Sequence, residues 1–180
     1  ALDGEDTASH STYRPVAVYA SDVNGDGITE LPRAVLMAGY KDTSSSDAVY
    51  MLDWYAYGIG KVPAKVATTY QNISDAWSLL IDQKWHDRIT AIKANDGGLS
   101  YVEFFEYRKN KMSIPLFNIY CATGSNREYY AERTDLIQLG QTTQAIYFAK
   151  LTNEGEQSEL ALTGDEIKAR FSLVNQAWNN

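Results

Sequence analysis

Cysteine and histidine are nearly absent from this chain of 180 residues, which holds one cysteine, Cys121, and two histidines, His10 and His86. A single cysteine excludes an internal disulfide. Cys121 lies in the apolar run PLFNIYCATG with neither histidine near it in sequence, which favours a buried, inert thiol over a nucleophile. His86 stands beside Asp87 in KWHDR, and adjacent residues on a strand point to opposite faces, so a surface turn is the better interpretation.

Basic residues and long apolar runs are also scarce. The chain has 16 Lys and Arg against 23 Asp and Glu, and its net charge of -7 argues against a nucleic-acid partner, because neutralising phosphates requires clustered cations. No run of about 18 apolar residues is present, so no membrane span is expected. The start ALDGEDTASH has neither a charged beginning nor an apolar core. If a signal peptide or a lipid anchor exists, we expect it to precede this chain.

Familiar catalytic motifs are missing as well. The sequence holds no G-x-S-x-G, no P-loop, no glycine fingerprint and no H-E-x-x-H. Asp165 and Glu166 are adjacent acids, but a place in the first turn of a helix explains both through capping and the helix dipole. The sequence therefore predicts that the protein is not an enzyme. An uncharacterised hydrolase, which needs paired acids in a deep pocket, is the least favoured alternative.

A pattern of alternating oxygen donors is present in SDVNGDGITELP, residues 21–32. Counting from Asp22 as position 1, Asn24 and Asp26 follow at positions 3 and 5, Ile28 offers a backbone carbonyl at 7, and Glu30 stands at 9. Calcium takes six to eight hard oxygen ligands, and a tight loop with alternating donors supplies them from few residues. Glycines between the donors allow the positive φ angles that wrap a chain around an ion. An Asx-rich turn that binds nothing is the alternative.

An EF-hand does not fit this pattern. Its loop requires a bidentate Glu at position 12, where this chain has Arg33, and its exiting segment is a helix, where this chain has Pro32. The flanking segments PVAVYA and RAVLMAGY are typical of strands instead. The sequence therefore predicts a β-hairpin with a metal-binding turn.

The stretch VAVYASDVNGDGITELPRAVLM resembles an FG-GAP or VCBS repeat, the calcium-binding hairpin of integrin-type propellers and many bacterial surface proteins. The resemblance covers residues 14–58 and implies Ca²⁺ ligands at Asp22, Asn24, Asp26, the Ile28 carbonyl and Glu30. Glu30 departs from the Asp more usual at the ninth position. Only one such repeat is present, whereas a propeller needs several blades.

The order of the remaining elements predicts an α+β fold. Strands are expected through VYMLDWYAYG, around 77–81, around 88–94, and through LSYVEFFEYRK and SIPLFNIYCA, with a hairpin turn at NDGG. GIGKVPAKVA is typical of a crossing segment or a short linker. Capping boxes at Ser125 and Thr163 each predict a helix, the second continuing through Phe171 and Val174 to Trp178. We therefore expect an antiparallel sheet with a short helix and a packed C-terminal helix, preceded by a small β-meander carrying the calcium loop.

Three segments are expected: a flexible N-terminal segment at 1–13, the FG-GAP-like meander at 14–62, and an α+β sandwich domain at 63–180. Through AWSLLI and the Trp that follows it, PLFNIY and the expected terminal helix, the second half is similar to the PsbP/Mog1-type sandwich. The whole resembles C-terminal regions of uncharacterised clostridial cell-envelope lipoproteins. This resemblance implies an extracellular or cell-envelope location and a cell-surface protein or glycan partner.

Aromatic residues are abundant, with thirteen tyrosines and four tryptophans. In DWYAYG, alternation predicts that Asp53, Tyr55 and Tyr57 share one strand face, while Trp54 and Ala56 share the other. Tyr55 and Tyr57 could stack sugar rings or form one side of a packed sheet. The favoured interpretation is a non-enzymatic secreted or cell-surface module with a structural Ca²⁺ loop, and the alternative is a carbohydrate-binding module that uses these two tyrosines.

Overall fold

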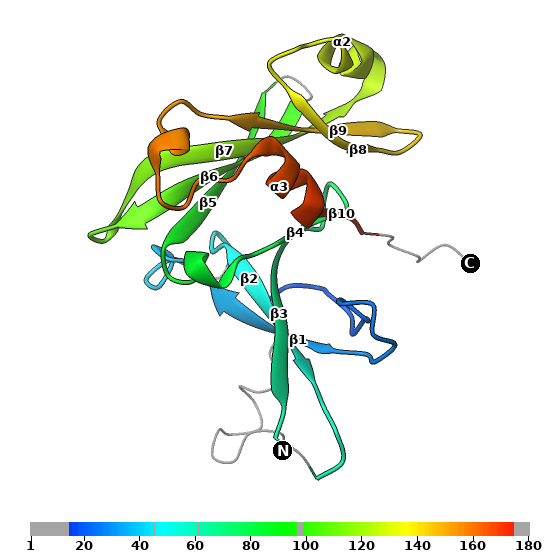
Figure 1. Ribbon diagram of the computed structural model, residues 1–180, viewed down its shortest axis with the longest axis vertical. Coiled ribbons are helices and arrows are strands. Elements are labelled where there is room, and N and C mark those ends of the chain that lie inside the picture. The colour runs from blue at the N-terminus through cyan, green and yellow to red at the C-terminus, as the bar shows by residue number, and fades with distance from the viewer. Residues whose placement is uncertain (1–14, 45, 61, 97–98, 175–180) are drawn as a thin grey trace.

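Two antiparallel β-sheets make up most of the protein (Figure 1). The computed structural model describes residues 15–44, 46–60, 62–96 and 99–174, and ten strands lie within them. The first sheet has the order β1-β2-β3-β4-β10, with β1 Leu31–Leu36, β2 Tyr50–Ala56, β3 Ala64–Asn72, β4 Trp77–Leu80 and β10 Phe171–Leu173. The second has the order β5-β6-β7-β9-β8, with β5 Ile89–Asp96, β6 Leu99–Arg108, β7 Lys111–Thr123, β8 Ile137–Gln141 and β9 Ala145–Leu151.

Short helices connect some of these strands. The α-helices are α2 (Arg127–Ala131) and α3 (Gly164–Arg170), and the 3-10 turns are η1 (Gln83–Trp85), η2 (Gly124–Asn126) and η3 (Gly155–Gln157). Among the described residues no helix has the length and apolar character that a membrane span requires.

The main core lies between the two sheets. Strand alternation turns Tyr70 of β3 and Phe104 of β6 toward each other, and their rings meet edge to face at 5.4 Å. Phe104 stacks in turn on Phe117 of β7 at 4.8 Å, and Trp85 of η1 lies 5.8 Å from Phe117. These contacts hold the sheets together where they face each other, while the β2–β3 hairpin extends away from the second sheet (Figure 1).

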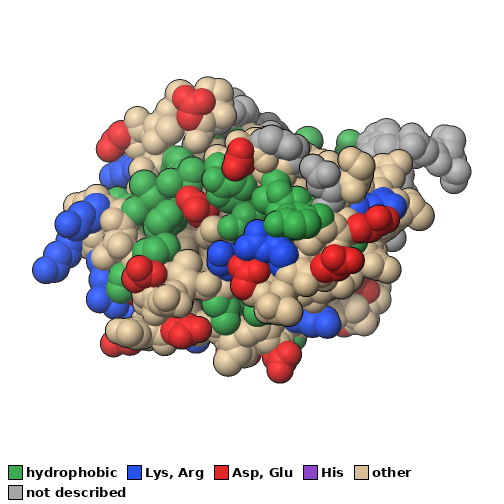
Figure 2. Space-filling view, turned by 90° about the horizontal axis from the view of Figure 1, so that it is seen from above, with side chains coloured by type: hydrophobic (Ala, Val, Ile, Leu, Met, Phe, Trp, Pro, Cys, Tyr) green, Lys and Arg blue, Asp and Glu red, His purple; other side chains and the backbone are tan. Residues whose placement is uncertain are grey.

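A smaller core lies on the outer face of the second sheet. Ala122, Ile146 and Phe148 are buried there, with Tyr130 from α2 packed against them. Figure 2 views the molecule from the end that carries this sheet and shows hydrophobic side chains gathered between acidic and basic ones. The small core explains why α2 lies against the outer face.

The predicted α+β fold with a packed C-terminal helix is wrong. The described chain is mostly antiparallel β-structure, arranged like a sandwich, and its two α-helices have five and seven residues. The capping box of Thr163 and Glu166 is present, but the helix ends at Arg170. Phe171 to Leu173 instead pair with the edge of β4. This pairing satisfies backbone N–H and C=O groups of β4 that would have no partner there if the helix continued. Trp178, the last residue of the expected helix, lies outside the described residues.

Several predicted strands are present and two segments differ. β2, β4, β5, β6 and β7 lie where they were expected. PVAVYA forms no strand, and among the described residues the only strand pairing near it is a single bridge between Ser21 and Glu30. The expected linker GIGKVPAKVA instead leads into β3, because its second half pairs with β2. The NDGG turn falls partly outside the described residues.

The expected boundary between residues 62 and 63 falls in the loop that joins β2 to β3. β1 and β2 precede it, yet they share a sheet with β3, β4 and β10, which follow it. Side chains from both sides also enter one core, as Met51 and Trp77 show. The expected flexible segment 1–13 lies outside the described residues.

Candidate metal centre

A ten-residue loop is closed at its base by a single β-bridge. Ser21 and Glu30 exchange backbone hydrogen bonds of 3.2 and 3.0 Å, and β1 begins at the next residue, Leu31. The predicted exit into a strand is therefore present, and Arg33, at the position where an EF-hand would need its Glu, lies within β1. The bridge brings the two ends of the loop together and thus sets Glu30 against the residues that follow Ser21.

Asp22 organises the interior of the loop. Its Oδ1 accepts from the backbone N–H groups of Gly25 at 2.7 Å and Asp26 at 3.1 Å, and its Oδ2 accepts from Gly27 at 2.8 Å. Gly25 and Gly27 have φ angles of 77° and 84°, in the left-handed region that glycine adopts without strain. These two glycines allow the chain to curl around one carboxylate.

The same hydrogen bonds keep Asp22 ionised. The Gly27 N–H is the largest cause that lowers the pKa of Asp22 below its ordinary value, and the N–H groups of Gly25, Asp26 and Asn24 add to it, while slight desolvation acts in the opposite direction. Backbone donors favour the charged form of a carboxyl group. Asp22 is therefore a fixed negative charge at the start of the loop.

Asn24 and Asp26 meet on the exposed side of the loop. Asn24 Nδ2 donates to Asp26 Oδ2 at 2.9 Å, while Asp26 Oδ1 accepts from the Ile28 N–H at 2.8 Å. The Ile28 side chain is half exposed. The structure thus places the predicted ligand residues Asn24 and Ile28 in direct contact with Asp26.

Glu30 is the unusual member of the set. Its side chain is fully buried, and Oε2 accepts from the Val23 N–H at 2.9 Å. Oε1 is also buried and has no hydrogen-bond partner in the part of the chain that the structure describes. A buried carboxylate oxygen without a partner is costly. Glu30 was predicted as a ligand from its place in the pattern, but its burial could not be read from the sequence.

Three carboxylates converge at this loop. One carboxylate oxygen each of Asp22, Asp26 and Glu30 lies within 4.8 Å of the other two. No ion pair to a basic side chain involves these three acids within the described residues. Like charges so close repel one another unless a cation is shared between them. Oxygen donors of this kind are the ligands of Ca²⁺ and Mg²⁺, so the residues present fit a hard divalent cation.

The second predicted site, Tyr55 and Tyr57, lies at the end of β2. The β2–β3 register shifts between Trp54 and Tyr55, and the extra residue of this bulge, Val66, lies on β3. Tyr55 is half-buried, and Tyr57, just beyond the end of β2, is 39% exposed. Asp53 is buried, where it accepts from Thr68 Oγ1 at 2.6 Å. The two tyrosines thus differ in exposure.

The titratable groups considered for catalysis lie apart from the loop. Cys121 is buried, and burial, with the Asp75 charge adding to it, raises the pKa of its thiol to about 11. His86 lies at the end of η1 and pairs with the exposed Asp87 at 3.0 Å. Neither arrangement activates a nucleophile.

Comparison of the chain with protein-family models, with curated proteins and with solved structures finds no match. The geometry of the loop itself therefore has to carry the functional interpretation.

Proposed function

We propose that this protein is a non-enzymatic secreted or cell-surface module in which a bound Ca²⁺ stabilises the loop of residues 21–30. The observation that carries this proposal is the Glu30 carboxylate, which is fully buried with one unpartnered oxygen and lies beside Asp22 and Asp26. A divalent cation held by the three acids would remove both the desolvation cost of Glu30 and the repulsion between the charges.

The role of the ion would be architectural. Asp22 lies at the start of the loop and Glu30 immediately before β1, so a shared cation ties the loop to the edge of the first sheet. The Asn24 side-chain oxygen and the Ile28 carbonyl would supply further ligands from the exposed side. A ligand that binds only the folded state adds stability in proportion to its occupancy.

An extracellular or cell-envelope location agrees with a site of this kind. Modules outside the cell use sites with dissociation constants of about 10⁻⁴–10⁻³ M, because calcium is plentiful there. The resemblance to FG-GAP and VCBS hairpins supports the same location, with a cell-surface protein or glycan as partner. The neutral, buried thiol of Cys121 and the surface pair of His86 and Asp87 support a non-enzymatic role.

Thermal unfolding in EGTA and then in about 2 mM Ca²⁺ tests the proposal. For a dissociation constant of about 10⁻⁴ M, binding adds about 1.8 kcal/mol, which raises the midpoint by about 4–7 °C in a chain of this size. Asp26→Ala should lose this rise. Glu30→Gln should lose it too, while its midpoint in EGTA stays at or above that of the wild type, because one repelling charge is gone.

Asp47→Asn is the matched control. Asp47 is an exposed acid in another turn, where it accepts from Ser44 Oγ at 2.8 Å, so this variant should keep the full calcium response. If the wild type shows no rise with calcium, the loop is an Asx-rich turn and the proposal is overturned. A rise that survives in both Asp26→Ala and Glu30→Gln would place the ion elsewhere.

A further inference from the structure

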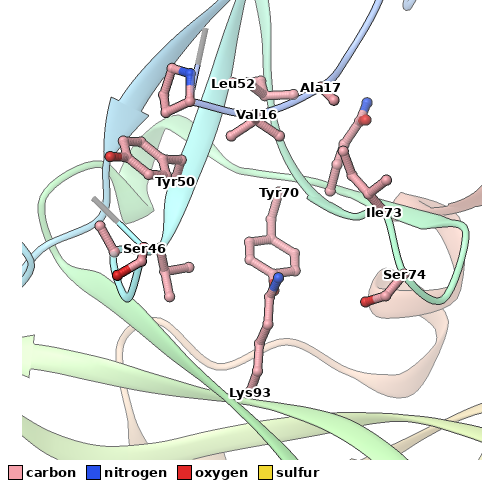
Figure 3. Close-up of a pocket in the computed structure, with 13 residues that line it drawn as sticks. Val16, Ala17, Ser46, Tyr50, Leu52, Tyr70, Ile73, Ser74 and Lys93 are labelled. Atoms are coloured by element: carbon pink, nitrogen blue, oxygen red, sulfur yellow. The ribbon is translucent and has the colours of Figure 1, made fainter. Parts of the chain in front are cut away.

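A cleft of about 330 Å³ lies where the first sheet faces β5 (Figure 3). Its walls come from the start of β2, the end of β3 with the turn that follows, residues 15–17, residues 46, 48 and 49, and one side chain of β5. Val16, Val49 and Ile73 supply apolar surface, and Ser46, Gln71 and Ser74 supply polar groups. Pockets of this size with a few placed polar groups are typical of small-molecule sites.

Tyr70 projects from β3 into the middle of the lining (Figure 3). Its side chain is 1% exposed, and its ring packs against Trp77 at 5.5 Å and Phe104 at 5.4 Å. The hydroxyl, however, has no hydrogen-bond partner within the described residues. Burial raises the pKa of Tyr70, with the charge of Asp75 and Tyr40 adding to it, so the hydroxyl stays protonated. It is a buried donor without an acceptor, which proteins seldom leave in place.

Lys93 reaches the same cleft from the opposite sheet. Ile89 and Ala91 are buried on the inner face of β5, and the two-residue period of a strand brings Lys93 onto that face. Figure 3 shows its side chain rising from β5 toward Tyr70. Lys93 forms no ion pair in the part of the chain described, and among the described residues of the lining it is the only ionised side chain.

We propose that this cleft binds a small carboxylate-bearing polar molecule of sugar-acid size, with its carboxylate on Lys93 and an acceptor oxygen on the Tyr70 hydroxyl. One lysine balances one carboxylate, whereas a phosphate dianion would need further cations, and the described residues of the lining supply none besides Lys93. The amide of Gln71 and the hydroxyls of Ser46 and Ser74 suit the hydroxyl groups of such a ligand. The overall charge of -7 repels anions, so binding depends on this one placed cation.

Calorimetric titration with glucuronate, glucose and acetate tests the proposal. Glucuronate carries both a carboxylate and ring hydroxyls, glucose lacks the carboxylate, and acetate lacks the hydroxyls. We expect glucuronate to bind more tightly than either. Lys93→Met should weaken it about tenfold and Tyr70→Phe about fivefold, from the loss of a charged and a neutral hydrogen bond. Lys111→Met removes the same charge from an exposed position at the start of β7 and should leave binding unchanged.

Three results would overturn the proposal: no binding of either acid, glucose binding as tightly as glucuronate, or full affinity in Lys93→Met. If acetate matches glucuronate, the carboxylate is recognised but the sugar-acid assignment is wrong.

Thermal unfolding without ligand checks the stability of Tyr70→Phe separately. Its midpoint should equal or exceed that of the wild type, because the hydroxyl removed has no partner. A fall would show that the protein itself uses that hydroxyl. None of these results bears on the calcium loop, which the cleft does not include.

Discussion

The hydroxyl of Ser158 donates a hydrogen bond of 2.7 Å to Oε2 of Glu106, and both side chains are buried. The other carboxylate oxygen of Glu106 accepts from Arg108 Nε and lies 3.7 Å from Arg88 Nη2. Both arginines remain partly exposed, while Glu106 is fully buried. This contact joins β6 to the segment that follows η3, across 52 residues of chain.

Glu106→Gln should therefore lower the free energy of unfolding by about 1.5–3 kcal/mol, because a neutral amide makes weaker hydrogen bonds than the charge-assisted ones of the buried carboxylate. The matched control is Glu159→Gln. Glu159 also pairs with Arg88, at 2.9 Å, but its side chain is 77% exposed, so its loss should cost less than about 1 kcal/mol. Urea unfolding of the three proteins measures the difference. Equal losses in the two variants would show that burial of Glu106 does not strengthen the contact.

Substitution of alanine for either of two glycines should destabilise the protein, for a different physical reason at each position. Gly27 has a φ of 84° with open space around it, so Gly27→Ala should cost about 1 kcal/mol through backbone strain, and Gly27→Asn less. A Cβ at Gly155 would lie 2.4 Å from the Leu116 carbonyl oxygen and 2.6 Å from Thr152 Oγ1. Gly155→Ala should therefore lower the free energy of unfolding by about 2–3 kcal/mol, because the new methyl group would overlap these atoms.

Urea unfolding in calcium and in EGTA distinguishes the two effects. Gly27→Ala should lose part of the calcium response, because the N–H of Gly27 holds the Asp22 carboxylate in place. Gly155→Ala should keep that response in full while its unfolding midpoint falls in both buffers. A calcium response that is intact in Gly27→Ala would mean that the loop tolerates strain at this position.

Features that depend on neighbouring residues could be predicted from the sequence. The Thr163 capping box needs only Glu166, three positions away, and the structure contains it. The convergence of Asp22 and Asp26 likewise follows from glycines that stand beside them. At Ser125 the same reasoning found a short helix but not its start, because Ser125 lies inside η2 and Thr123 occupies the N-cap without a side-chain hydrogen bond.

Features that depend on distant partners could not be predicted in the same way. The spacing of Ile167, Phe171 and Val174 suits a helix, and burial of Ile167 and Phe171 suits either structure. The outcome was decided by β4, whose edge pairs with Phe171 to Leu173 from a position far earlier in the chain. The cleft is similar, since Tyr70 and Lys93 come from different sheets and no local pattern connects them.

Cys121 should react slowly in the folded protein. Burial first, and the Asp75 charge second, raise the pKa of its thiol to about 11 from 9.0. Because the thiolate is the reactive form, reaction with a disulfide reagent at about pH 8 should be about 100-fold slower than in urea.

The stability of the protein should also depend on pH through this thiol. The folded state keeps the thiol proton of Cys121 between about pH 9 and 11 while the unfolded state releases it, so the free energy of unfolding falls as pH rises through that window. The urea midpoint should therefore fall less between about pH 8 and pH 10 in Cys121→Ala than in the wild type. Equal falls in the two proteins would show that the fold does not hold the thiol neutral. A native thiol that reacts at the unfolded rate would show the same.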